Sequence, residues 1–270
     1  MAGEIRVSGP IWLIGCGNMA GAMLHRWLAA GLEPGLVTVV RPSGVPPAPG
    51  VRTLRDLPQG ETPPRILMLG VKPQKLADVT DAVAAATGPE TLVISILAGT
   101  EIAALRARFP RAGRVVRAMP NTPVAIGRGV VGLAGDPGER RAELDTLMAP
   151  LGACVWITDE ALLHTVAALA ASGPAFVFRF IAAMASGAAA LGLPAEQALR
   201  LAVATVDGAA GLAAASDETP DRLADRVASP GGMTRKGLDV LDANDAMHDL
   251  IARALAAAEQ RSREMAAETR

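Results

Sequence analysis

Short apolar runs alternate with helical patterns through the first half of the chain. The runs are rich in Val, Ile and Leu and lack the regular polar alternation of a half-exposed strand. Such runs are typical of parallel strands buried on both faces. They predict strands at Ile11–Ile14, Leu36–Val40, Ile66–Val71, Thr91–Ile96 and Arg114–Arg117, and further apolar segments around Val130 and Val155. Helical patterns follow and end near Gly31, Ala86, Phe109 and Leu151. We therefore expect an open α/β sheet of the Rossmann type.

From about Asp159 onward the pattern is helical only. Helices are expected from Pro194 to Ala215, from Pro220 to Ala228 and from Lys236 to the end. Thr219 before Pro220 fits an N-cap followed by proline at the first helical position. The change of pattern predicts two domains, a Rossmann-like α/β domain over residues 1–158 and an all-helical domain over residues 159–270.

The start of the helical half is unusually poor in charge. Arg179 is the only permanently charged residue between Ala161 and Pro194. The segment consists largely of Ala, Gly and Ser, and Gly173-Pro174 interrupts it, which does not favour a membrane span. Small residues without a polar face are better explained by helices buried against another subunit. We expect a homo-oligomer with no membrane anchor.

Composition excludes several classes of function. The net charge is −1 and aromatic residues make up 3% of the chain, so nucleic-acid binding has no basic, aromatic surface to support it. Cys16 and Cys154 lie far apart in sequence, and the three histidines are scattered, so no metal site is expected. Few cysteines and an N-terminus without a signal-peptide pattern favour the cytoplasm.

A glycine-rich turn joins the first predicted strand to the first predicted helix. It reads Gly15-Cys16-Gly17-Asn18-Met19-Ala20. In this context it matches the dinucleotide fingerprint, in which the first glycine makes the turn and the second lets the backbone approach the pyrophosphate. The small third residue lets helix and strand pack closely. Gly15, Gly17, Asn18, Met19 and Ala20 are therefore candidate cofactor residues, and a methyltransferase glycine loop is the alternative.

The end of the second strand indicates which dinucleotide binds. An NAD enzyme places Asp or Glu there, whereas this chain has Arg41 and Ser43, which suit a 2′-phosphate. The expected cofactor is NADPH, with NADH as the alternative. Four prolines between Pro42 and Gly50 predict that the usual second helix is replaced by an extended loop.

Loops after later strands complete the candidate cofactor set. Since the carboxyl ends of parallel strands share one sheet edge, loops that follow them meet where ligands bind. The residues concerned are Gly70, Val71, Lys72, Pro73, Ala98, Gly99 and Asn121.

A second glycine turn lies in the helical half, at Ser229–Thr234. Adjacent glycines let backbone N–H groups converge on an anion, and a following helix adds its N-terminal dipole. Thr234 contributes a hydroxyl. The turn suits a small carboxylate, although a simple helix–turn–helix is the alternative explanation.

Together these motifs resemble the pyrroline-5-carboxylate reductase family, whose members catalyse the last step of proline synthesis with NAD(P)H. The resemblance covers nearly the whole chain. It rests on the GCGNMA loop, Val71-Lys72-Pro73, the Ala98-Gly99 loop, residues 117–123, Ser172-Gly173-Pro174-Ala175 and the Ser229–Thr234 turn.

The resemblance implies a Rossmann domain joined to a helical dimerisation domain, and a homodimer or a decamer. It implies hydride transfer from the nicotinamide to the imine carbon of 1-pyrroline-5-carboxylate. It also implies that Thr234 hydrogen-bonds the ring nitrogen as the catalytic residue. The implied substrate-binding residues are Ser172, Gly173, Ser229, Gly231, Gly232, Met233 and Thr234.

The chain departs from the family pattern near the substrate residues. Ala170-Ala171 stand where the family has Ser-Gly, Phe176 replaces a tyrosine, Met233 replaces a small residue or threonine, and Arg226 replaces an uncharged polar residue. Two alternatives therefore stay open, a reductase of another cyclic imine or β-hydroxy acid, and a non-catalytic regulatory protein that binds dinucleotide. The β-hydroxy acid enzymes use a helix-borne lysine, and no lysine occurs between Lys75 and Lys236.

Overall fold

The computed structural model describes residue 5 and residues 7–269, and the chain packs as two compact units. Unit 1 comprises the residues up to Ser172 together with those from Ala258 onward, and unit 2 is Gly173–Ala257. The domain boundary at residue 159 expected from the sequence stays a prediction.

Unit 1 is built on one eight-stranded sheet with the strand order β3-β2-β1-β4-β5-β6-β7-β8. The strands are β1 Ile11–Ile14, β2 Val37–Val40, β3 Arg52–Leu54, β4 Ile66–Leu69, β5 Leu92–Ser95, β6 Arg114–Pro120, β7 Gly129–Gly135 and β8 Gly152–Ile157. All neighbours run parallel except β6 and β7, which are antiparallel. The Rossmann-type sheet is confirmed, and β3 is a strand that the sequence did not predict.

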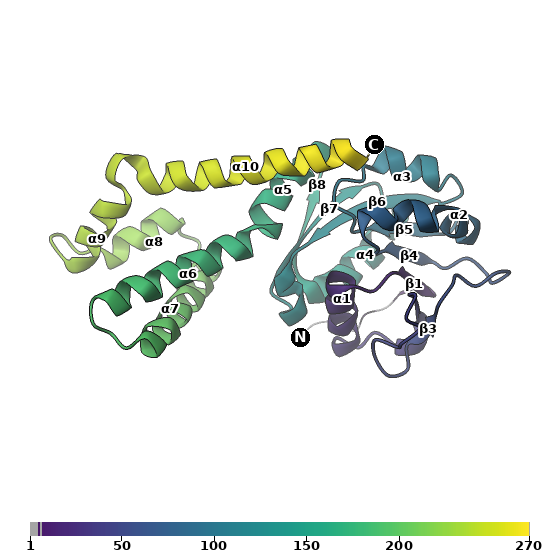
Figure 1. Cartoon of the computed structure of the whole chain (residues 1–270), viewed down its shortest axis with the longest axis horizontal. Coiled ribbons are helices and arrows are strands. Elements are labelled where there is room, and N and C mark those ends of the chain that lie inside the picture. Colours follow the sequence, from purple (N-terminus) through teal and green to yellow (C-terminus); the bar gives the residue numbers. More distant parts are fainter. Residues whose placement is uncertain (1–4, 6, 270) are drawn as a thin grey trace. The chain divides into compact units, whose positions relative to one another are not determined.

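Helices cover both faces of this sheet (Figure 1). They are α1 Asn18–Ala29, α2 Leu76–Ala86, α3 Ile102–Arg108 and α4 Arg141–Met148. Side chains from α1 and α4 share one apolar cluster, and those from α2 and α3 share another. Short 3-10 helices lie at Pro34–Leu36, Pro73–Lys75, Thr122–Ile126, Gly138–Arg140, Ala149–Leu151, Glu160–Leu162 and Ala243–Asp245.

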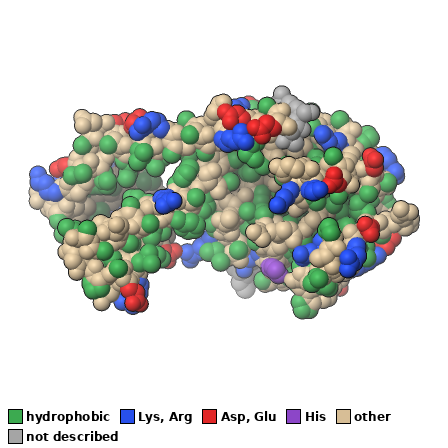
Figure 2. Space-filling model, in the orientation of Figure 1, with side chains coloured by type: hydrophobic (Ala, Val, Ile, Leu, Met, Phe, Trp, Pro, Cys, Tyr) green, Lys and Arg blue, Asp and Glu red, His purple; other side chains and the backbone are tan. Residues whose placement is uncertain are grey.

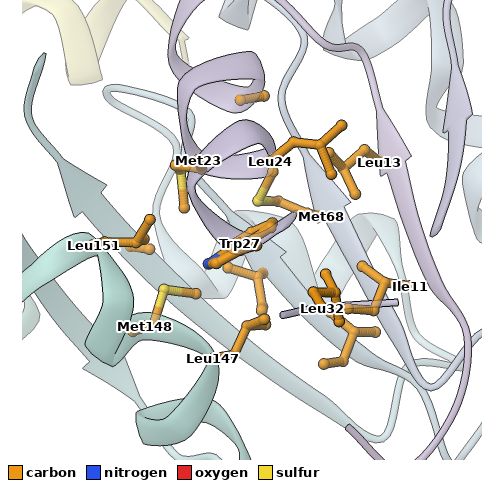
Figure 3. Close-up of a cluster of buried hydrophobic side chains, with 14 of the residues drawn as sticks. Ile11, Leu13, Met23, Leu24, Trp27, Leu32, Met68, Leu147, Met148 and Leu151 are labelled. Atoms are coloured by element: carbon orange, nitrogen blue, oxygen red, sulfur yellow. The ribbon is translucent and has the colours of Figure 1, made fainter. Parts of the chain in front are cut away.

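The unbroken apolar strands follow from this two-sided burial. Successive side chains of a strand point to opposite faces. Ile11 and Leu13 of β1 therefore pack with Trp27 of α1 (Figure 3), whereas Trp12 and Ile14 join the cluster on the opposite face. Because each face carries helices, no position of β1 is left for a polar residue.

The proline-rich segment behaves as expected. Residues 42–50, all of them described, form turns and extended backbone without a helix. The chain then enters β3, which pairs with β2 at the edge of the sheet. The place of the usual second helix is taken by loops on either side of this short strand.

The last part of unit 1 combines two distant segments. Helix α5, Leu163–Val166, runs into a π-helical turn, Ala167–Ala171. Helix α10, Ala246–Thr269, contributes its residues from Ala258 onward. His164 Nδ1 lies 2.9 Å from Ser262 Oγ, so the end of α10 packs on α5.

Unit 2 consists of helices. They are α6 Gly173–Ala190, α7 Ala195–Ala215, α8 Pro220–Val227, α9 Met233–Leu241 and the part of α10 up to Ala257. Thr219 caps α8 by accepting from Arg222 N, and Pro220 opens the helix, as predicted. The expected continuous helix from Lys236 to the end is wrong. It breaks where Asn244 and Asp245 adopt φ values of 53° and 58°, a left-handed conformation that Asn and Asp tolerate better than most residues.

Many hydrophobic side chains of unit 2 are exposed (Figure 2). Examples are Val177, Phe178, Leu199, Leu201 and Leu212. The runs Glu160–Ala190 and Ala195–Ala215 are also long and apolar enough to cross a membrane by length and composition, with only 6% and 11% of their windows buried. One or two such helices are weak evidence for a membrane, but an apolar surface of this kind calls for a partner.

Candidate functional site

A cavity of about 1120 Å³ lies along the carboxyl ends of β1, β2 and β4 in unit 1. This is the edge where open α/β sheets bind ligands. The predicted cofactor residues that line it are Gly15, Gly17, Arg41, Gly70, Val71 and Lys72. The cavity is large enough for a dinucleotide-sized ligand.

The two glycines of the loop at this cavity, Gly15 and Gly17, have different roles. Gly15 has φ +82°, and a Cβ there would lie 2.9 Å from the carbonyl of Gly70. Its N–H donates to Val40 O at 2.8 Å. A Cβ on Gly17 would meet nothing within 4 Å. Gly15 is therefore required by the protein's own packing, whereas the space at Gly17 is open to a ligand.

The third small residue is explained by the same packing. Ala20 is 1% exposed, and a Cβ on Gly70 would lie 2.8 Å from its methyl group. Asn18 and Met19 begin α1, and no side chain caps the helix at Gly17. The first backbone N–H groups of α1 are thus available to an anion, which fits a pyrophosphate.

A cation lies beside this loop. Arg41 follows β2 and is half-buried, and Cys16 of the glycine loop lies close enough to respond to its charge. Burial raises the pKa of the Cys16 thiol, and the Arg41 guanidinium partly offsets that rise. Ser43 is exposed and accepts a hydrogen bond from Val45 N at 3.3 Å, but it does not line the cavity.

Sequence reasoning missed two walls of the cavity, one formed by residues of α2 and the other by the loop after β3. Residues 55–61, which follow β3, line it throughout. They carry no recognisable motif, and only the pairing of β3 with β2 brings them beside Arg41. Arg52 and Glu61 close this loop through a hydrogen-bonded ion pair.

The other predicted cofactor residues lie outside the cavity lining. Pro73 opens a 3-10 helix and Ala98 is exposed. Gly99 is buried with φ +77°, and a Cβ there would lie 3.1 Å from Ala266 Cα, so this glycine admits the end of α10. Asn121 is 6% exposed; its Nδ2 donates to Ala170 O at 2.9 Å, and its Oδ1 accepts from Val130 N at 2.8 Å. These bonds tie the loop after β6 to the π-helical turn.

The predicted carboxylate site is the turn between α8 and α9 in unit 2. Gly231 has φ +70°, and Gly232 N donates to Ser229 O at 2.9 Å. Gly232 is the N-cap of α9, so this helix begins at Met233, earlier than the sequence suggested. Met233 is 92% exposed and Thr234 is half-buried. The helix N-terminus therefore lies within the motif itself.

The remaining predicted residues lie next to these features. Ser172 ends the π-helical turn, and its Oγ donates to Ala167 O at 3.4 Å. Gly173 is the first residue of α6. Arg226 pairs with Glu218 at 2.6 Å, which gives this departure from the family pattern an ionic partner. The candidate cofactor residues thus lie in unit 1, and the substrate residues of the Ser229–Thr234 motif lie at the α8–α9 turn in unit 2. Ser172 and Gly173 lie where the chain passes from unit 1 to unit 2.

Across residue 5 and residues 7–269, no three or more His, Cys, Asp or Glu side chains are arranged to hold a metal ion.

The sheet order, the open second glycine and the cavity at the carboxyl edge together define a Rossmann-type dinucleotide-binding protein. Comparison with known proteins extends this class. The profile for pyrroline-5-carboxylate reductase dimerisation matches residues 160–265. A pyrroline-5-carboxylate reductase of Pseudomonas aeruginosa is 34% identical over 95% of this chain and 96% of its own. The chain belongs to the pyrroline-5-carboxylate reductase family.

Solved structures agree with this assignment. A pyrroline-5-carboxylate reductase from Coxiella burnetii has a TM-score of 0.88 at 31% identity, covering 96% of this chain and 99% of its own. The Plasmodium falciparum pyrroline carboxylate reductase, solved with NADP bound, has a TM-score of 0.83 at 24% identity, covering 98% and 100%. The second comparison shows the shared fold.

Proposed function

We propose that this protein reduces 1-pyrroline-5-carboxylate to L-proline with NADPH. The observation that carries the proposal is the similarity to a reductase of this name over almost the full length of both chains. The geometry of unit 1 supports it, because the glycine loop leaves space only where a pyrophosphate has to approach. The protein acts as an oxidoreductase on a C=N bond, in the biosynthesis of proline.

The cofactor group fits a nicotinamide dinucleotide. The N-terminus of α1 offers uncapped N–H groups to the pyrophosphate, and Arg41 offers its guanidinium to the 2′-phosphate. When bound, NADPH supplies the hydride. Gly70, Val71 and Lys72 line the same cavity from the β4 side. Asn18, Met19, Ala20, Ser43, Pro73, Ala98, Gly99 and Asn121 remain proposed contacts or supports of the cofactor.

The residues that bind the substrate have to position it, and none of them has to be a strong acid. A protonated imine is already a strong electrophile, so the protein has to hold the ring and orient its nitrogen. The N-terminus of α9 presents backbone N–H groups to the carboxylate, and Thr234 in its first turn presents a hydroxyl to the ring nitrogen. Because the backbone N–H groups hold the carboxylate and the Thr234 hydroxyl orients the nitrogen of an already protonated imine, no strong general acid is required.

The protein is a homo-oligomer, since residues 160–265 match a dimerisation profile. We propose a dimer at least, with the exposed apolar side chains of α6 and α7 covered by a second copy, and a decamer as the larger alternative. Covering these side chains with protein removes the need for a lipid partner. A cytoplasmic location follows from the same proposal.

The test is loss of absorbance at the reduced-nicotinamide band with 1-pyrroline-5-carboxylate, in parallel with NADPH and NADH. The variant Thr234→Ala should reduce kcat/KM by roughly 10-fold or more, the loss expected when a hydrogen bond to a reacting group is removed. Thr219→Ala is the matched control, because Thr219 caps the neighbouring helix α8. Binding of NADPH without turnover would favour a regulatory role. If the protein reduced another cyclic imine and not 1-pyrroline-5-carboxylate, the proposed substrate would be wrong and the proposed reaction, reduction of a C=N bond, would stand.

A further inference from the structure

Two arginines stand side by side at the carboxyl ends of β2 and β3. The register pairs Val40 with Leu54, and Arg41 N donates to Leu54 O at 2.9 Å. The next residues of the two strands are Arg41 and Arg55. Register partners in a parallel pair project to the same face, and adjacent strands are about 4.8 Å apart. Both arginines line the large cavity.

The backbone around Arg55 directs its side chain toward Arg41. Arg55 Nη1 donates to Pro42 O at 3.2 Å, so the guanidinium lies against the residue that follows Arg41. Gly44 has φ +65°, and a Cβ there would lie 3.2 Å from Arg55 Cγ. The turn after β2 thus makes room for the stem of Arg55. The charge of Arg41 reaches Cys16 of the glycine loop, which places Arg41 on the pyrophosphate side of Arg55.

Neither arginine is neutralised by the described part of the chain. No Asp or Glu forms an ion pair with Arg41 or Arg55 among the described residues, whereas Lys75, another cation of the lining, is paired with Asp78 at 2.9 Å. Two adjacent cations without a counter-charge repel each other. A dianion between them would remove the repulsion and accept from both guanidinium groups.

The pair lies in the direction that the adenosine ribose has to take. The order β3-β2-β1 puts the edge strand about 10 Å from β1, the strand that ends in the glycine loop. A pyrophosphate at the α1 N-terminus therefore leaves the ribose beside β2 and β3. Ser43 uses its Oγ as an acceptor for Val45 N, and its hydroxyl donates to no acceptor among the described residues, so it can donate to a ligand.

We infer that Arg55 forms a guanidinium pair with Arg41 that binds the 2′-phosphate of NADPH and sets the preference for NADPH over NADH. The inference rests on the proposed function only in requiring that a nicotinamide dinucleotide binds in unit 1. It names a specificity-determining residue that the sequence did not indicate, because Arg55 becomes a neighbour of Arg41 only through strand pairing.

The direct test uses fragments of the cofactor. Dissociation constants of 2′,5′-ADP and 5′-AMP are measured by titration calorimetry at one fixed ionic strength, for the full chain and for Arg55→Gln, Arg41→Gln and the double variant. Arg55→Gln should weaken 2′,5′-ADP by about 10-fold or more, since a charge-assisted hydrogen bond is lost, and 5′-AMP by less than about 2-fold. The double variant should bind the two fragments with similar affinity.

Lys75→Gln is the matched control, because it removes a cation from the same lining without touching the pair. Lys75→Gln should change the dissociation constants of 2′,5′-ADP and 5′-AMP by the same factor and leave their ratio unchanged. Arg55→Lys keeps the charge but loses the planar fork, so it should recover part of the preference. An unchanged ratio in Arg55→Gln, or an equal loss for both fragments, would overturn the inference.

Turnover separates this inference from the proposed function. The ratio of kcat/KM values for NADPH and NADH should fall in Arg55→Gln by about the same factor as the fragment ratio. Absence of any pyrroline-5-carboxylate turnover, with fragment discrimination intact, removes the proposed function and leaves the arginine pair. Normal turnover of pyrroline-5-carboxylate with an unchanged NADPH preference in Arg55→Gln would keep the proposed function and overturn the arginine pair.

Discussion

The two glycines of the nucleotide loop make opposite predictions when each is replaced by alanine. Gly15→Ala should damage the fold, whereas Gly17→Ala should leave the fold intact and damage cofactor binding. The difference comes from what an added methyl group meets. At Gly15 it lies 2.9 Å from the Gly70 carbonyl and from Val71 Cγ1, and at Gly17 it meets nothing within 4 Å.

The magnitudes follow from the backbone and the contacts. Gly15 has φ +82°, a conformation that costs an L-residue roughly 1–2 kcal/mol, and overpacking against a neighbouring backbone adds about 1–3 kcal/mol. Gly17 has φ −80° and ψ −165°, which any residue adopts. Alanine is a poorer N-cap than glycine, which lowers stability by about 0.5–1 kcal/mol. Alanine also makes the unfolded chain less flexible, which raises stability by about 0.4–1 kcal/mol. The net change in Gly17→Ala is therefore close to zero.

Two measurements test this contrast. Urea unfolding followed by circular dichroism should show a lower free energy of unfolding for Gly15→Ala only. Calorimetric titration with NADPH should show a dissociation constant roughly 10- to 100-fold higher for Gly17→Ala, because the methyl group separates the pyrophosphate from the backbone N–H groups. Wild-type NADPH affinity in Gly17→Ala would refute the placement of the pyrophosphate, and wild-type stability in Gly15→Ala would refute the packing argument.

Three further predictions concern buried polar groups of unit 1. Asn121→Ala removes the bonds to Ala170 and Val130 and should lower the free energy of unfolding by about 2–3 kcal/mol in urea, and a loss below about 0.5 kcal/mol would contradict it. Glu160→Gln removes the carboxylate charge that pairs with the 2%-exposed Arg117 at 2.7 Å and keeps only an amide oxygen as acceptor. It should lower the free energy of unfolding by about 2 kcal/mol, discounted from a fully buried pair because the Glu160 side chain is 30% exposed. Burial, and then the positive charges of Arg263 and Arg117, hold the pKa of His164 below its usual 6.5. The negative charges of Glu259 and Glu101 raise this pKa by smaller amounts. The unfolded chain then takes up the proton first, so stability is full above about pH 6.5 and falls as the pH drops through the folded pKa. His164→Gln should reduce this slope in melting temperatures measured between about pH 7.5 and 5, and an unchanged slope would count against it.

Local signals explain what the sequence could predict. The run Ile11–Ile14, the glycines after it and the cap at Thr219-Pro220 all act within a few residues, so they are visible in the chain itself. The prolines between Pro42 and Gly50 exclude a helix for the same reason. The fold class and the glycine loop of the candidate site therefore needed no tertiary information.

Long-range pairing explains what the sequence could not predict. Strand β3 has only three residues, two of them Arg and Thr, and it exists because β2 offers an edge. Arg55 enters the candidate site through that pairing alone. Asn121 was predicted from the sequence as a cofactor residue, whereas its hydrogen bonds to Ala170 and Val130 are set by tertiary structure and could not be predicted.

The return of α10 to unit 1 has a consequence for biosynthesis. The residues from Ala258 onward are synthesised only after all of Gly173–Ala257, yet Ser262 bonds to His164 and Ala266 packs against Gly99. The α/β unit thus cannot finish folding until the whole of Gly173–Ala257 has been synthesised. A nascent chain halted within Gly173–Ala257 exposes His164 and the Gly99 loop, surfaces that are covered in the completed protein. Synthesis through Gly173–Ala257 and into the end of α10 is therefore a precondition for the α/β unit to reach its final packing.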